Sequence, residues 1–145
     1  MDLYEHQGKE LFARFGVPVS EGYVAFTPQE AEDAARRMGA QVVVKAQVLA
    51  GGRGKAGGIK LANTPEEARG YAESILGMDI KGHEVRRLWI ERASDIKHEY
   101  YFSITFDRSA KAPLLMLSTM GGMDIEQVAE EHPDKLARMH VNPTY

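Results

Sequence analysis

A glycine-rich, cationic segment carries the clearest chemistry in this sequence. Residues 51–58 read Gly-Gly-Arg-Gly-Lys-Ala-Gly-Gly, with Arg53 and Lys55 as the two cations. A β-branched run that ends at Lys45 precedes the segment, and the apolar run 59–61 follows it, so we expect a strand on either side. Glycine lets backbone N–H groups approach and face an anion, and the cations supply countercharge. The pattern therefore predicts a site for a polyphosphate.

Other phosphate-binding motifs fit this segment less well. Residues 52–57 match G-x-G-x-x-G, but a dinucleotide fingerprint must open a helix, and the residues after Gly57 form helices poorly. A Walker A loop needs Gly where Leu49 stands and Ser or Thr where Ala56 stands. A protein-kinase glycine loop precedes its lysine, whereas Lys45 comes first here. A plain glycine hairpin with solubilising charges remains open as an alternative.

A second candidate cluster consists of Glu91 and Glu99, at the expected end of one strand and start of the next, with residues 92–98 between them. Carboxylates at adjacent strand ends can accept hydrogen bonds from ribose hydroxyls or from the amino group of a base. Two alternatives stay open from the residues alone: solvated acids at strand ends, and a general acid–base pair.

Two matching helix starts organise the first part of the chain. Thr27-Pro-Gln-Glu30 and Thr64-Pro-Glu-Glu67 each predict a capping box with Pro at the first helical position. The two helices should end near Gly39 and Gly77. We expect strands at 23–26, 42–46, 59–62 and 85–92, which gives two β-α-β units with the basic loop between them. Helices packed on a sheet are the natural assembly.

Less regular patterns flank this region. Residues 2–15 predict a helix whose Phe12 and Phe15 lie in the core. From about residue 84 the pattern becomes rich in strands, and alternation over 99–107 predicts a half-buried strand with Phe102, Ile104 and Phe106 on one face. Further elements are expected as a strand over 112–118, a helix over 124–131 and a strand over 136–141.

Composition sets limits on function. A chain of 145 residues can bury one core, and a net charge of −3 with a pI near 6 argues against nucleic acid as the main partner. There is no cysteine, no apolar N-terminal leader and no run of about 18 apolar residues that would span a membrane. The five histidines lack metal-ligand spacing and no Ser-His-Asp set is readable, so we assign no catalytic and no metal-ligating residue.

The chain resembles the β subunits of ADP-forming succinate–CoA ligases, which are ATP-grasp proteins. Lys45 with the segment Ala50–Gly58, the opening Met1–Phe12 and the stretch Ile90–Glu99 carry the resemblance. It covers essentially all of this chain, but only the first part of a family subunit more than twice as long. The implied fold is α/β, the N-terminal portion of an ATP-grasp domain with helices on a mixed sheet. Its nucleotide-grasping lobe would span about 20–95, residues 96–145 would begin an adjoining β-rich lobe, and the chain would be incomplete at its C-terminus.

The resemblance also implies an activity. The family forms succinyl-CoA from succinate and CoA at the expense of ATP, through an acyl phosphate and a phosphohistidine on an α subunit, in the cytoplasm and the tricarboxylic acid cycle. The isolated fragment would be inactive, because the Mg²⁺ ligands would lie beyond Tyr145. A malate–CoA ligase β subunit, a non-catalytic nucleotide-binding module and a Rossmann-type oxidoreductase are the alternatives.

Site residues follow from the matching positions. The resemblance implies nucleotide contacts at seven residues: Lys45, Gly52, Arg53, Gly54, Glu91, Ser94 and Glu99. Lys45 and the loop residues would bind phosphate, while the glutamates and the position of Ser94 would line the nucleoside side. Met120 departs from the pattern, because an acidic residue is expected there, and this puts a polar role for its loop in doubt.

Overall fold

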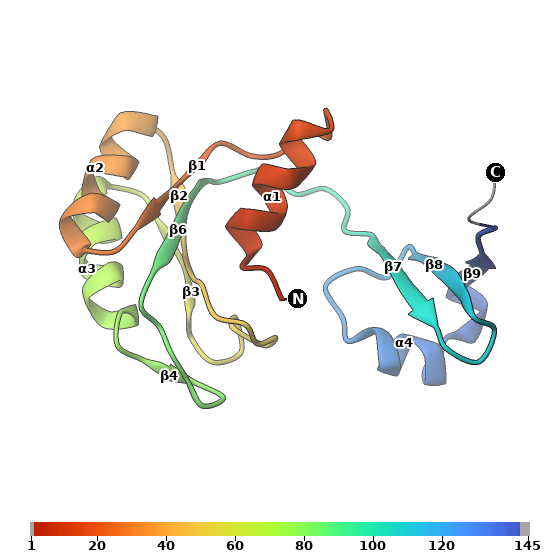
Figure 1. Cartoon of the computed structure of the whole chain (residues 1–145). Coiled ribbons are helices and arrows are strands. Elements are labelled where there is room, and N and C mark those ends of the chain that lie inside the picture. Colours follow the sequence, from red (N-terminus) through yellow and green to blue (C-terminus); the bar gives the residue numbers. More distant parts are fainter. Residues whose placement is uncertain (1, 143–145) are drawn as a thin grey trace. The chain divides into compact units, whose positions relative to one another are not determined.

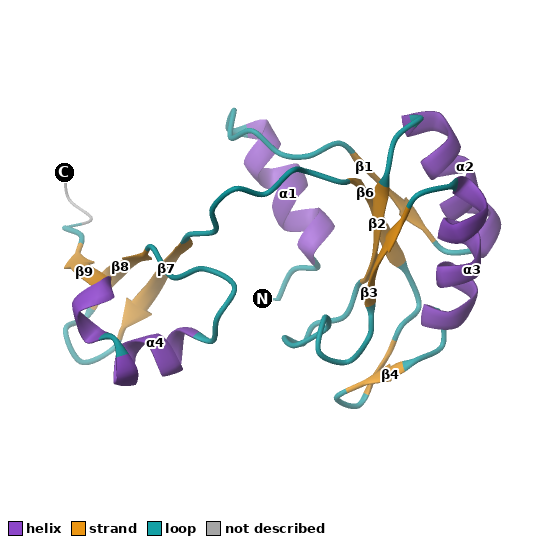
Figure 2. Ribbon diagram, turned by 180° about the vertical axis from the view of Figure 1, so that it is seen from behind, coloured by secondary structure: helices purple, strands orange, loops and turns teal. Residues whose placement is uncertain are grey.

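The computed structural model describes residues 2–142 and divides into two compact units, with the boundary between Ser94 and Asp95 (Figures 1 and 2). None of the helices within 2–142 has both the length and the apolar character needed to cross a bilayer. The first unit contains α1 (Glu5–Arg14), β1 (Gly22–Ala25), α2 (Pro28–Met38), β2 (Val42–Ala46), β3 (Ile59–Ala62), α3 (Pro65–Ile75), β4 (Asp79–Ile80), β5 (His83–Glu84) and β6 (Leu88–Arg92).

The main sheet of the first unit has the strand order β1-β6-β2-β3, and every neighbouring pair is antiparallel. Strands β1 and β2 both run antiparallel to β6, so they are parallel to each other with β6 between them. In the same way β3 and β6 are parallel, with β2 between them. The two predicted β-α-β motifs, β1-α2-β2 and β3-α3-β6, are therefore present. Strand β6 lies between the two strands of the first motif, and β2 lies between the two strands of the second.

Capping residues start the two helices that cover this sheet. The Thr27 side chain accepts a hydrogen bond from the Glu30 N–H at 3.2 Å, and the Glu30 carboxylate accepts from the Thr27 N–H at 3.3 Å. Thr64 caps α3 in the same way, at 3.1 Å. The second reciprocal bond differs from the prediction, because Glu67 accepts from the Asn63 N–H at 2.7 Å, one residue before the cap.

The core of the first unit lies between the sheet and the pair α2 and α3. Strand β2 alternates, with Val42, Val44 and Ala46 buried and Lys45 only partly so. Figures 1 and 2 show α2 and α3 on one side of the sheet and α1 on the other. Because side chains alternate between the faces of a strand, Lys45 points to the side that carries α1.

Helix α1 meets the sheet with an unexpected face. The prediction that Phe12 and Phe15 lie in the core is wrong, since they are 56% and 79% exposed. The buried residue of α1 is His6, whose Nδ1 lies 3.1 Å from Oε1 of Gln47. The physical reason is charge: the face of α1 turned to the sheet carries Glu5, which pairs with Lys45, so apolar side chains of the second half of the helix remain at the surface.

The second unit is a three-stranded antiparallel sheet, β7-β8-β9, with a helix. It contains β7 (Tyr101–Asp107), β8 (Ala112–Ser118), α4 (Ile125–Glu131), the 3₁₀ turn η1 (Pro133–Lys135) and β9 (Leu136–His140). The cross-strand pair Ser118–Leu136 is buried, as is Val128 of α4. The opposite face carries the apolar pairs Phe102–Leu117, Ile104–Leu115 and Phe106–Pro113.

Burial on that apolar face was predicted wrongly. Phe102, Ile104 and Phe106 do share one face, as the alternation indicated, but each is about 60% exposed. The alternating pattern identifies which side chains share a face, and a second layer is needed to bury them. Within residues 2–142 the second unit provides such a layer on the Ser118 face only.

Candidate functional site

The loop between β2 and β3 is the structural setting of the predicted phosphate site. Strand β2 ends at Ala46 and β3 begins at Ile59, with only turns between them, so the prediction of flanking strands is confirmed and the dinucleotide interpretation is wrong. The loop folds back on itself through bonds from the Gly58 N–H to Arg53 O at 2.9 Å and from the Ala56 N–H to Gly52 O at 3.1 Å. Gly52 has a φ of +81°, which a side chain would strain.

Lys45 stands at the start of this loop and is held by two carboxylates. Its Nζ donates to Oε1 of Glu91 at 2.8 Å and to Oε1 of Glu5 at 3.1 Å. Burial alone would lower the pKa of Lys45, but the hydrogen bonds and charges of Glu91 and Glu5 outweigh it and raise the pKa above its usual value. The ammonium is therefore a fixed positive charge.

Arg53, in the loop, forms an ion pair with Glu5 of α1, the same residue that binds Lys45. Its Nη1 lies 2.7 Å from Oε2 of Glu5 and donates to the carbonyl of Ala46 at 3.0 Å. Burial would raise the pKa of Glu5, but Lys45 and Arg53 outweigh it and lower this pKa to about 2. Glu5 thus ties the loop arginine and the strand lysine to one carboxylate.

Glu91 lies on β6, and its carboxylate accepts hydrogen bonds from three other side chains. Besides Lys45, its carboxylate accepts hydrogen bonds from Lys9 of α1 and from the indole Nε1 of Trp89, the latter at 2.7 Å. Burial would raise the pKa of Glu91, but these three donors, Lys45 first, outweigh it and lower the pKa. The residue is only 7% exposed, so the alternative of a solvated acid is wrong for Glu91.

Three cations and two carboxylates thus form one cluster, which we call the loop-base cluster: Lys9, Lys45, Arg53, Glu5 and Glu91. Three positive and two negative charges leave one net positive charge beside a loop rich in backbone N–H groups. Cations that are already oriented need no reorganisation when an anion arrives. The arrangement suits the binding of a phosphate group.

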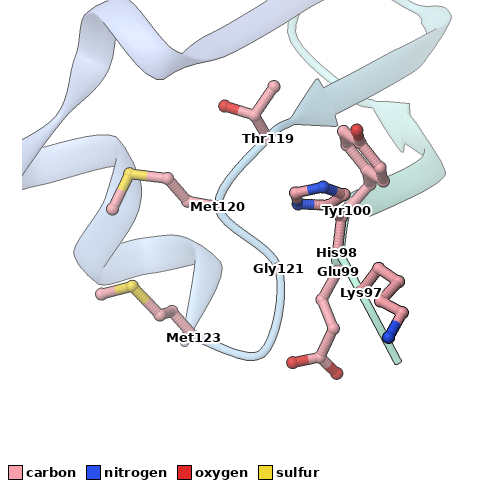
Figure 3. A pocket seen from close by; sticks show the side chains of 8 residues that line it. All are labelled: Lys97, His98, Glu99, Tyr100, Thr119, Met120, Gly121 and Met123. Carbon is pink, nitrogen blue, oxygen red and sulfur yellow. The ribbon is translucent and has the colours of Figure 1, made fainter. Parts of the chain in front are cut away.

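The remaining predicted residues have different surroundings. Gly54 lies in the exposed part of the loop. Ser94 is exposed at the end of the first unit, with its Oγ 3.5 Å from Oγ of Ser20. Glu99 belongs to the second unit, where it is exposed and lines a cleft of about 390 Å³ together with Tyr100 and Met120 (Figure 3).

A pair of glycines supports Glu99 in that cleft. The Gly121 N–H donates to the Glu99 carbonyl at 3.1 Å. A Cβ added to Gly122 would lie 2.8 Å from Oε2 of Glu99, closer than such atoms approach. The absence of side chains at these two positions leaves room for the backbone and the carboxylate of Glu99.

Sequence reasoning missed three residues of the loop-base cluster and its surroundings: Glu5, Lys9 and Trp89. Glu5 and Lys9 are spaced i, i+4, which indicates only a pair on a helix surface. No local pattern could show that Glu5 pairs with a lysine 40 residues later. No group of three or more His, Asp or Glu side chains within residues 2–142 is arranged to hold a metal ion.

Comparison with known proteins gives consistent results. The sequence profile of the ATP-grasp domain matches residues 2–145. The chain is 60% identical over 143 residues to the succinate–CoA ligase [ADP-forming] subunit beta of Rubrobacter xylanophilus, covering 99% of this chain and 37% of that protein. It is 52% identical over 143 residues to the succinate–CoA ligase [GDP-forming] subunit beta of Thermus thermophilus, covering 99% of this chain and 38% of that protein.

A solved structure also shares the fold. The dinucleotide-forming acetyl-coenzyme A synthetase 1 of Ca. Korarchaeum cryptofilum, in complex with coenzyme A, Ca-AMPCP and HgCl⁺, superposes with a TM-score of 0.77 at 22% identity. The match covers 95% of this chain and 59% of that one. The chain spans little more than a third of the length of the two curated relatives.

Proposed function

The chain belongs to the ATP-grasp domain family, and we propose that it supplies the phosphate-binding part of the nucleotide site in the β subunit of a succinate–CoA ligase. The observation that carries the proposal is the loop-base cluster, which holds Lys45 and Arg53 beside the glycine loop. Identity of 60% to a named β subunit supports the substrate assignment. A β subunit acting on malate would use the same phosphate site, so the site itself does not separate the two acids.

Each residue has a proposed task. Lys45, Arg53 and the backbone of Gly52 and Gly54 bind the phosphates of ATP or ADP. The carboxylate of Glu91 already accepts hydrogen bonds from three side chains, so its proposed task is to orient Lys45, in place of the nucleoside contact that the resemblance implied. Ser94 and Glu99 face the nucleoside, where exposed oxygens can accept from ribose hydroxyls or a base amino group. The region of about 20–95 then acts as the nucleotide-grasping lobe, and 96–145 begins an adjoining lobe.

The whole-protein activity follows as part of the same proposal. ATP cleavage would drive acyl phosphate formation from succinate and then thioester formation with CoA, through a phosphohistidine on a cytoplasmic α subunit partner. The described residues do not fit a Mg²⁺ site, because they lack a cluster of oxygen ligands. The proposal assigns the Mg²⁺ ligands to the part of the full-length subunit that this chain does not span.

Nucleotide binding by the full-length subunit with its α partner tests the proposal. Replacing Lys45 by Ala removes a charged hydrogen bond to phosphate, and the ATP affinity should fall about 10- to 150-fold. Lys60→Ala, at an exposed position of the neighbouring strand β3, is the control for the loss of one charge. Unchanged ATP affinity in Lys45→Ala would refute the assignment. ATP binding without succinate-dependent turnover would favour the non-catalytic nucleotide-binding module instead.

A further inference from the structure

The hairpin formed by β4 and β5 has an unusual residue at its tip. Ile80 pairs with His83, so Lys81 and Gly82 form a two-residue turn, and their φ angles are +54° and +81°. Two successive positive φ angles define the type I′ turn, in which Asn-Gly is the preferred sequence. A lysine is disfavoured there, because its Cβ crowds the backbone when φ is positive. Backbone outliers of this kind cluster at functional sites.

The Lys81 side chain extends to the phosphate loop. A Cβ added to Gly52 would lie 3.3 Å from Nζ of Lys81 and 3.5 Å from its Cε, so the ammonium lies beside the space that a side chain at Gly52 would fill. The hairpin and the loop lie at the same end of the sheet in Figures 1 and 2. A cleft of about 470 Å³ is lined by the start of the loop, with Gln47 and Leu49, and by the hairpin, with Asp79 and His83.

The positive charge of Lys81 is not paired with a carboxylate within residues 2–142, unlike the positive charges of the loop-base cluster. Lys45 and Arg53 are each paired with a carboxylate. Lys81 forms no ion pair with another residue of the described range 2–142, and the nearby Asp79 instead accepts from the Gly82 N–H at 3.0 Å. An uncompensated ammonium is thus held beside backbone N–H groups that suit an anion.

We propose that Lys81 is a third phosphate-binding cation of the nucleotide site, after Lys45 and Arg53. The β4–β5 hairpin carries this lysine, and its ammonium lies beside Gly52. The inference rests on the proposed function, because it assumes that a nucleotide phosphate lies at this loop. It gives Gly52 a second role, because a side chain there would strain a positive φ and would also crowd the Lys81 ammonium. Glu5 and Glu91 neutralise part of the positive charge of Lys45 and Arg53. Lys81 then adds a positive charge for the phosphate that these two carboxylates do not neutralise.

Two substitutions of Lys81 separate its charge from its backbone role. Asn favours a positive φ, so Lys81→Asn preserves the turn and removes the ammonium, while Lys81→Arg keeps a cation. The chain offers a matched control in Lys111, an exposed lysine with a φ of +53° in the turn between β7 and β8. Lys111→Asn removes the same charge from the same backbone conformation in the second unit.

The experiment measures ATP and adenosine affinity by calorimetry in the full-length β subunit with its α partner. Lys81→Asn should weaken ATP binding about 10- to 150-fold, the value of one charged hydrogen bond. Adenosine binding should stay the same, and Lys81→Arg should retain most ATP affinity. Lys111→Asn should change neither affinity by more than about two-fold. The melting temperature of Lys81→Asn should not fall.

The outcomes distinguish the inference from the proposed function. Wild-type ATP affinity in Lys81→Asn, or an equal loss in Lys111→Asn, would overturn the role of Lys81. If Lys45→Ala still weakens ATP binding in that case, the proposed function survives and only the role of the hairpin fails. If neither Lys45→Ala nor Lys81→Asn alters ATP affinity, both assignments fall together.

Discussion

The indole Nε1 of Trp89 donates a hydrogen bond to Oε2 of Glu91 at 2.7 Å, while Oε1 of the same carboxylate accepts from Lys45 at 2.8 Å. The single tryptophan of the chain and the proposed phosphate-binding lysine therefore donate to the same carboxylate. Any change in the partners of Lys45 alters the electrostatic environment of the indole ring.

We expect ATP to change the fluorescence emission of Trp89. A phosphate that shares the Lys45 ammonium weakens the pair between Lys45 and Glu91, and the indole responds through its bond to Glu91. A fluorescence titration of the chain measures this, with adenosine as the control that lacks phosphate. Lys45→Ala should abolish the response, and an unchanged response in that variant would separate Trp89 from the phosphate site.

Acid should weaken the fold through Glu5. Its pKa is about 2 in the folded chain against a usual 4.5, so the stabilisation is complete above pH 4.5 and is lost as the pH falls from 4.5 towards 2. The shift corresponds to about 3 kcal/mol at most. Glu5→Gln should therefore lower the free energy of unfolding at pH 7 and flatten its dependence on pH below 4.5.

Denaturant unfolding at several pH values between 2 and 7 checks this expectation. Glu10→Gln, at an exposed position of the same helix, is the control. If both variants retain the acid sensitivity of the parent chain, Glu5 does not make the contribution assigned to it.

Much of the first unit could be predicted, because its signals are local. Strands β2 and β3 match the predicted ranges 42–46 and 59–62, since a β-branched run and a glycine-rich loop mark their ends. The Thr-Pro pairs located the starts of α2 and α3. Lys45 and Arg53 were predicted to lie together at the glycine loop, and the structure joins both to Glu5. Glu91 was predicted in a separate cluster with Glu99, whereas the structure pairs it with Lys45.

The rest depends on partners distant in sequence. Which face of α1 meets the sheet is decided by Glu5 and His6, whose partners lie about 40 residues later. The periodicity of α1 favoured Phe12 as a core residue and could not show this. Similarly, alternation in β7 grouped Phe102 with Ile104 correctly but carries no information on which face another layer covers.

Gly122→Ala should disturb Glu99. A Cβ at this position would lie 2.8 Å from Oε2 of Glu99, and the φ of +72° disfavours a side chain. If Glu99 contacts the nucleoside, Gly122→Ala should weaken ATP binding about as much as Glu99→Gln, roughly 2- to 13-fold for one neutral hydrogen bond. The double variant should be little worse than either single variant.

Gly77→Ala provides the matched control for that experiment. Gly77 has a φ of +84° but open space around its Cβ position, so the substitution adds backbone strain without touching a carboxylate. Equal losses of ATP affinity in Gly77→Ala and Gly122→Ala would assign the effect to strain rather than to Glu99.

Two other glycines should respond in opposite directions to alanine. A Cβ on Gly22 would overlap the indole ring of Trp89, so Gly22→Ala should destabilise the fold by about 1–3 kcal/mol. Gly8 lies within α1 with open space around it, and Gly8→Ala should stabilise by about 0.5–1 kcal/mol. Denaturant unfolding measures both, and destabilisation by Gly8→Ala would show that α1 tolerates no side chain there.

The interleaving of the two β-α-β units has a consequence for synthesis on the ribosome. Strand β1 pairs only with β6 in this sheet, and Gly22 meets its partner Glu91 after 69 further residues have been made. Until β6 leaves the ribosome, the strand that belongs between β1 and β2 is missing, and the backbone groups of β1 and β2 that would pair with it have no partner in the sheet. The site matures at the same moment, because Glu91 arrives on that last strand. The nascent chain therefore gains its sheet and its lysine-holding carboxylate in one late step.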